Sequence, residues 1–128
     1  MGNVLDMSLH EHAEVGDING IKAYVARGGS VMRRDFYENT ALHRAASMGY
    51  TSITQYLLEE GAEVDAMAKD GWTPLHLACR WGRLEVARLL VEAGADVNKR
   101  TKDGRTPGEL MKVEMREADS NAMAKLLG

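Results

Sequence analysis

Cysteine is almost absent from this chain, since Cys79 is the only one in 128 residues. A single cysteine excludes a disulfide within the chain and any zinc site built from several cysteines. Chains without disulfides are typical of reducing compartments. We therefore expect the protein to work in the cytoplasm, and the nucleus is a second compartment that fits.

Proline and aromatic residues are also scarce. The chain has 2 Pro, 1 Phe, 4 Tyr and 2 Trp. So few prolines argue against a β architecture rich in turns and favour helices. The core must then consist mainly of Leu, Ala, Val, Ile and Met side chains. No apolar run approaches the roughly 18 residues of a membrane-spanning helix, so no membrane contact is predicted.

Neither sign of charge dominates the sequence. The 16 basic and 19 acidic side chains give a net charge of −3, which is too mild for a typical nucleic-acid-binding protein. No nucleic-acid partner is predicted. An apolar fraction of 45% and a charged fraction of 27% are those of a folded chain. The length corresponds to a single domain over residues 1–128.

The chain does contain an internal repeat with a period of 33 residues. Five sets of residues follow this step: Leu9-His10, Leu42-His43 and Leu75-His76; Gly16, Gly49 and Gly82; Gly28, Gly61 and Gly94; Val31, Val64 and Val97; and Thr40, Thr73 and Thr106. Such a period is a signature of stacked structural units. It divides the chain into a capping unit over about 2–34, two full units over 35–67 and 68–100, and a second capping unit over about 101–128.

Each full unit is predicted to form two helices and an extended loop. In the third unit Thr73 is a good N-cap, and Pro74 fits the first helical turn, where its missing N–H costs nothing. Gly82 ends this helix, and a second helix runs from near Leu84 to Gly94. A loop with a tight Asp-Gly turn then leads to the next unit. The second unit repeats this pattern.

The two outer units depart from it. In the first unit, His12 stands where the later units have alanine. In the last unit, the closing leucines fall four residues later than the repeat would place them. We therefore predict a longer first helix to about Glu117, a break at Asp119-Ser120, and a short closing helix.

These motifs identify the chain as similar to the ankyrin repeat family. The resemblance is carried by the segment DGWTPLHLA at 70–78, by Leu89-Leu90 and by the segment GADVN at 94–98. It implies an all-α ankyrin-repeat solenoid of helix-turn-helix units with short β-hairpin-like finger loops, about four units with two degenerate caps. It also implies that the protein binds another protein through a concave face made of finger loops and first helices.

Histidines and the cysteine invite a catalytic or metal-binding interpretation. His10, His43 and His76 occupy the same slot in successive units, so they should lie about 8–10 Å apart, which is too far to share a metal ion. The resemblance implies that each of them ties its turn to neighbouring backbone and Thr groups. Cys79 falls on an apolar helix stripe and is predicted to be a core residue. No enzyme activity, metal or cofactor is predicted.

Aromatic and basic residues at finger and first-helix positions are the candidates for partner contact. Exposed Trp, Tyr and Arg together are typical of interface hot spots. The alternative for the two tryptophans is that they only cover the neighbouring unit. The predicted partner-binding residues are Phe36, Tyr37, Asn39, Met48, Trp72, Arg80, Trp81, Arg100, Lys102 and Arg105.

The predicted partner is a protein segment with one or two large apolar side chains flanked by acidic residues. The apolar side chains would contact Trp72 and Trp81, and the carboxylates would meet the surrounding cations. Two other functions fit the same sequence. One is a regulatory inhibitor that binds a folded enzyme such as a kinase, and the other is a structural unit that pairs with itself. We expect a monomer.

Overall fold

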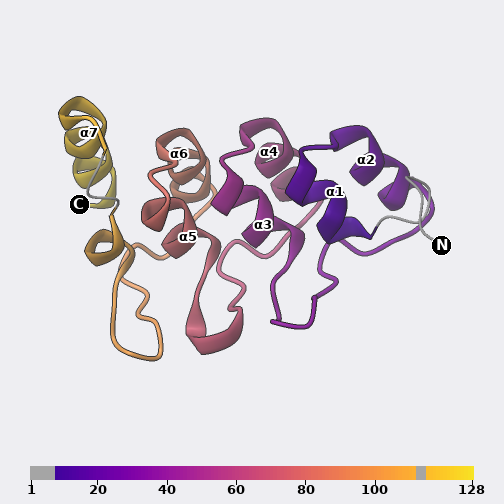
Figure 1. Cartoon of the computed structure of the whole chain (residues 1–128), viewed down its shortest axis with the longest axis horizontal. Coiled ribbons are helices and arrows are strands. Elements are labelled where there is room, and N and C mark those ends of the chain that lie inside the picture. Colours follow the sequence, from indigo (N-terminus) through magenta and orange to yellow (C-terminus); the bar gives the residue numbers. More distant parts are fainter. Residues whose placement is uncertain (1–7, 112–114) are drawn as a thin grey trace.

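The computed structural model describes residues 8–111 and 115–128. All regular structure in this part of the chain is helical, as predicted (Figure 1). The elements are α1 (Leu9–Val15), α2 (Ile18–Ala26), α3 (Ala41–Met48), α4 (Thr51–Glu59), η2 (Lys69–Gly71), α5 (Pro74–Arg80), α6 (Leu84–Glu92), η3 (Pro107–Leu110) and α7 (Glu117–Leu127), where η marks a 3₁₀ helix. Among the described residues, no helix has the length and apolar character needed to cross a membrane.

The helices form two parallel rows (Figure 1). The inner helices α1, α3 and α5 pack side by side, and each also packs on its outer partner α2, α4 or α6. The short η3 packs on α5, and α7 packs on α6, so the two rows continue to the C-terminal side. Isolated helices of this length are marginal in water, so packing between neighbouring units supplies the stability.

Local sequence signals set the bounds of the inner helices. The Thr40 side chain accepts a hydrogen bond from the backbone N–H of His43, and Thr73 does the same for His76, so both threonines are N-caps as predicted. Gly49 ends α3 with a φ of 80°, a left-handed conformation that favours glycine.

Small and branched apolar side chains fill the space between the rows. Leu42 and Leu75 are fully buried in equivalent places on α3 and α5. Cys79 is fully buried beside them, and this burial raises the pKa of its thiol to about 12. The predicted core role of this cysteine is confirmed, and the thiol stays protonated at neutral pH.

Three finger loops project from the N-terminal ends of the inner-row elements (Figure 1). We call residues 34–39, 67–72 and 100–105 the first, second and third finger. Neighbouring fingers are joined by backbone hydrogen bonds, from Lys69 N–H to the Tyr37 carbonyl (3.1 Å) and from Lys102 N–H to the Asp70 carbonyl (2.8 Å). The fingers therefore form one connected edge.

The last unit differs from its prediction. In place of a long first helix, the structure has the short η3, and residues 112–114 of the predicted helix lie outside the described part of the chain. The predicted break at Asp119-Ser120 is wrong, because α7 runs through both residues. Glu117 and Asp119 lie in the first turn of α7, where carboxylates stabilise a helix by facing its positive end.

Candidate protein-binding surface

Buried histidines fix each finger to the inner helix of the preceding unit. The His43 ring accepts a hydrogen bond at Nδ1 from the backbone N–H of Thr40 (3.1 Å) and donates one from Nε2 to the carbonyl of Trp72 (2.9 Å). Burial lowers the pKa of His43 to about 4, so the ring is neutral near pH 7. A neutral ring supplies one donor and one acceptor, as this position requires.

The bond to the following finger recurs at the other two histidines. His76 also pairs with Thr73, and its Nε2 lies 3.1 Å from the carbonyl of Arg105 in the third finger and 2.9 Å from that of Lys99. His10 donates from Nε2 to the carbonyl of Asn39 (2.8 Å). The role that the family resemblance implied, a tie to neighbouring backbone and Thr groups, is confirmed for His43 and His76, and its backbone part is confirmed for His10. Among the described residues, no group of three or more His, Cys, Asp or Glu side chains could hold a metal ion.

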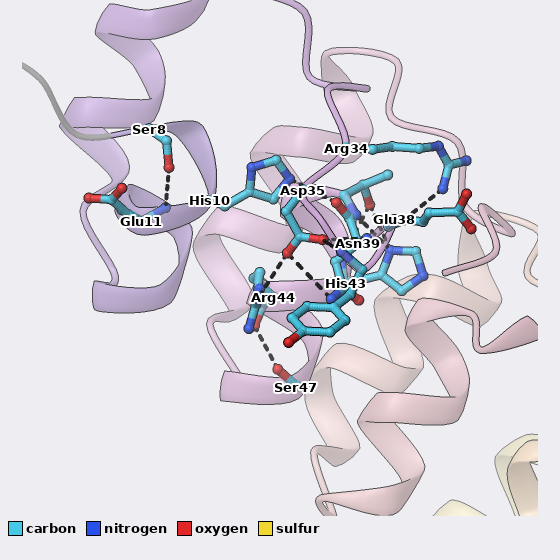
Figure 2. A network of polar contacts seen from close by, with 12 residues as sticks. Ser8, His10, Glu11, Arg34, Asp35, Glu38, Asn39, His43, Arg44 and Ser47 are labelled. Carbon is cyan, nitrogen blue, oxygen red and sulfur yellow. Dashed lines mark hydrogen bonds and ion pairs between the residues drawn. The ribbon is translucent and has the colours of Figure 1, made fainter. Parts of the chain in front are cut away.

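Asp35 organises the first finger (Figure 2). Its Oδ1 accepts hydrogen bonds from the backbone N–H groups of Tyr37 (2.8 Å) and Asn39 (2.9 Å), and its Oδ2 accepts one from Arg44 Nη2 of α3 (2.7 Å). Burial opposes ionisation of this carboxyl, but Arg44 and the two N–H groups hold its pKa below the ordinary value. The ion pair therefore anchors the finger to the inner helix.

The anchored finger presents two aromatic side chains to solvent. Phe36 is 91% exposed and Tyr37 is 56% exposed. Their rings meet edge to face with centroids 5.2 Å apart. Both are predicted partner-binding residues, and both are available for contact.

A groove of about 430 Å³ runs between α3 and α5. Met48 and Trp81, two further predicted residues, lie at the C-terminal ends of these helices and are 42% and 44% exposed. The described residues that line the groove include two arginines and no Asp or Glu: Asn39, His43, Arg44, Ser47, Met48, Leu77, Trp81 and Arg83. The groove is thus apolar at one end, and its positive charge comes mainly from Arg83, since Arg44 is paired with Asp35.

Basic side chains hold positions around this groove. The Arg80 guanidinium lies over the Trp81 ring, 4.9 Å from its centroid, which is a cation–π contact. Arg83 donates from Nε to the Ser47 carbonyl (3.0 Å) across the two units. Arg44 and Arg83 were not among the predicted residues. Their signal in the sequence is weak, because neither belongs to the repeated motif.

Trp72 lines a different hollow. That hollow, of about 440 Å³, lies between the second and third fingers and is lined by Asp70, Trp72, Lys102 and Asp103. Trp72 is half-buried, and its ring is tilted against His76 with centroids 5.9 Å apart. Trp72 precedes α5 and Trp81 follows it, so the two tryptophans lie at opposite ends of that helix. A partner that contacts both tryptophans therefore needs two separate apolar side chains, one in each hollow.

The cations of the third finger have acidic neighbours. Arg100 donates to the Gly104 carbonyl (2.7 Å) and lies 3.7 Å from the Glu109 carboxylate. Arg105 lies 3.2 Å from the Asp103 carboxylate. These carboxylates offset the charge of two predicted partner-binding residues, Arg100 and Arg105. The groove between α3 and α5 is therefore the more positive of the two surfaces.

A family model and several known proteins are similar to parts of this chain. A family model of ankyrin repeats (3 copies) matches residues 9–101. Protein phosphatase 1 regulatory subunit 27 of Homo sapiens is 39% identical over 64 residues, which cover 50% of this chain and 42% of the relative. Serine/threonine-protein kinase 12 of Arabidopsis thaliana is 43% identical over 60 residues, 47% of this chain and 13% of that protein.

A third relative is Potassium channel AKT1 of Arabidopsis thaliana, 38% identical over 61 residues that cover 48% of this chain and 7% of the channel. The matches to all three relatives span less than half of each relative's length. The 33-residue period, the stacked helix pairs and the matching family model together show that the chain belongs to the ankyrin repeat family.

Proposed function

We propose that this chain is a non-catalytic module that binds a partner protein on the concave side formed by the fingers and the inner helices. Ankyrin repeats indicate a protein–protein interaction module. The observation that carries the proposal is the groove between α3 and α5, where Met48 and Trp81 are exposed beside Arg80 and Arg83. Large exposed apolar side chains next to arginine have the composition of interface hot spots.

The chemistry of the groove favours a partner segment with a large apolar side chain flanked by Asp or Glu. The apolar side chain would be desolvated between Met48 and Trp81. The carboxylates would meet Arg83, which lines the groove, and Arg80, which lies over the Trp81 ring. Such charge pairs steer association and fix register more than they add affinity.

A second candidate is a regulatory subunit that binds a folded enzyme. It is favoured by the similarity to a protein whose name describes it as a regulatory subunit of a phosphatase. On this candidate, a large folded surface contacts both the groove and the exposed Phe36 and Tyr37 of the first finger. A short peptide would then reproduce only part of the affinity.

The test is a pull-down with the full chain as bait. Three versions of the chain are compared: the wild type, a double variant of the groove and a control variant. The wild type should retain a partner that the Met48→Glu, Trp81→Glu double variant releases. The matched control is the double variant Ala23→Glu, Gln55→Glu, since both residues are exposed on the outer helices α2 and α4 and lie outside the fingers and the groove. If both variants retain the partner equally, the groove is not the binding surface. Fragments of the retained partner that bind as tightly as the intact protein would favour the linear segment over the folded enzyme.

Light scattering of the free protein checks the expected monomer. A dimer that dissociates in the Trp81→Glu variant would instead support a unit that pairs with itself through this face.

A further inference from the structure

Three exposed apolar side chains form a row along the ends of the inner helices. Val15 is the last residue of α1, Met48 is the last residue of α3, and Trp81 is the C-cap of α5. They are 62%, 42% and 44% exposed, and they follow one another at the 33-residue step. Because α3 packs between α1 and α5, Met48 lies between the other two. We call these three residues the apolar row.

The spacing of the row suits one kind of secondary structure in a partner. Helices that pack side by side lie roughly 8–10 Å apart, so successive members of the row have about this separation. Seven residues of an α-helix advance about 10.5 Å in nearly two whole turns, which returns side chains to the same face. Three residues of a strand advance about 10 Å, but they end on the opposite face. A helix can therefore contact all three members, whereas a straight strand cannot.

Charge changes sign along the row. The residue before each member is Glu14, Ser47 and Arg80 in the three units. The Arg80 guanidinium lies over the Trp81 ring, and Ser47 lines the groove, so this position is adjacent to the row. Two residues after each member stand Asp17, Tyr50 and Arg83. The Val15 end is thus acidic and the Trp81 end is basic.

We propose that the apolar row binds an amphipathic helix of the partner whose large apolar residues recur at every seventh position. The helix carries carboxylates near the residue that contacts Trp81 and cations near the residue that contacts Val15. This inference rests on the proposed function and adds the secondary structure, the spacing and the direction of the bound segment. The acidic residues of the proposed partner segment then lie at only one end of the bound helix, the end that contacts Trp81.

The probe is a synthetic helical peptide of about 22 residues, long enough to cross three units. It has Leu at every seventh position, Glu around the Leu at one end, Lys around the Leu at the other, and Ala and Gln elsewhere. The matched peptide has the same composition with Leu at every fifth position, which places the leucines on different faces. Trp81 fluorescence, measured in a Trp72→Phe background, reports binding to the row.

The seven-spaced peptide should bind at least about tenfold more tightly than the five-spaced peptide, since two hot-spot contacts are lost in the latter. Val15→Asp and Met48→Asp should each weaken binding by a similar factor, and Met67→Asp should not. A quencher attached at the Glu end should reduce Trp81 emission, and one at the Lys end should not. Circular dichroism melting curves establish that each variant is folded.

A second variant tests direction without changing the row itself. Exchanging one pair of charges, as Glu14→Arg with Arg80→Glu, leaves Asp17 and Arg83 in place and makes each end of the row nearly neutral. Quenching of Trp81 should then no longer depend on which end of the peptide carries the quencher. Equal affinity of the two peptides, no binding of either, or no effect of Val15→Asp overturns the helical row. The proposed function still stands in those cases if the captured partner depends on Met48 and Trp81, so the two failures are distinguishable.

Discussion

The imidazole of His12 on α1 occupies the space beside Gly20 on α2, so closely that a Cβ atom at position 20 would lie 2.1 Å from His12 Nδ1. In the second unit the equivalent pair is Ala45 and Ile53, with the large side chain on the outer helix. The third unit has Ala78 and Val86. The first unit therefore keeps its interior filled by exchanging the large and small partners, and Asp17 accepts the His12 Nδ1 hydrogen bond at 3.0 Å.

This exchange predicts a strong coupling between positions 12 and 20. Gly20→Val should lower the free energy of unfolding by roughly 1–3 kcal/mol, because it overpacks a filled space. His12→Ala should also destabilise, by leaving a cavity. The double variant copies the pattern of the later units. Its loss in free energy of unfolding should be smaller than the sum of the two single losses by about 1 kcal/mol. Urea unfolding of the four proteins measures this coupling, and strict additivity would contradict it.

Protonation of His43 predicts a loss of stability in acid. The folded protein holds the pKa of this ring at about 4, below the ordinary 6.5, because burial disfavours the charged form. Between these two values the unfolded chain binds the proton and the folded chain does not, so stability falls as pH falls from about 6.5 to about 4. The full effect is on the order of 3 kcal/mol. Urea unfolding at several pH values should show this slope, and His43→Gln should reduce it; an unchanged slope would contradict the assignment.

The C-terminal cap is predicted to protect the third unit. Met123 of α7 is fully buried where α7 packs on α6. Met123→Ala should cost about 2–5 kcal/mol, and Lys125→Ala, at an exposed position of the same helix, should cost little. A chain ended after Asn98 should melt at a lower temperature and aggregate, because the apolar faces of α5 and α6 lose their cover. A monomeric truncated chain with an unchanged melting curve would contradict this.

Much of the fold is predictable because the signals for it are local. Thr40, Thr73 and Gly49 each act within one turn of the helix that they begin or end. In the last unit the local sequence signals do not match the observed helices. Gly108 has no side chain to add to an inner helix, and η3 is short there. Asp119-Ser120 has the composition of a break, but its place in the first turn of α7 depends on where α6 offers packing.

The candidate site was less predictable because its residues meet across units. Arg83 reaches the Ser47 carbonyl of the preceding unit, just as the Tyr50 hydroxyl reaches the Glu14 carbonyl (3.1 Å). The two contacts are equivalent, because Tyr50 and Arg83 are 33 residues apart. Their side chains are so different that the sequence alone does not indicate a shared contact. The distance between Trp72 and Trp81 could have been inferred, since a helix of seven residues spans about 10 Å.

Charge around the groove predicts how the partner associates. Arg80 is exposed and lies over Trp81, whereas Arg105 is paired with Asp103 on its own finger. Charge reversal at Arg80 should therefore slow association more than charge reversal at Arg105. Dissociation should also change less in the Arg105 variant, because Arg105 lies on the third finger, whereas Arg80 contacts Trp81 of the groove lining. The difference between the two variants should shrink as salt is raised, because exposed charges are screened beyond about 10 Å at 0.1 M. Stopped-flow association rates with the captured partner across a salt series measure this. Rates that do not respond to salt, or equal effects of the two reversals, would show that the cations at the Trp81 end of the groove do not steer the partner.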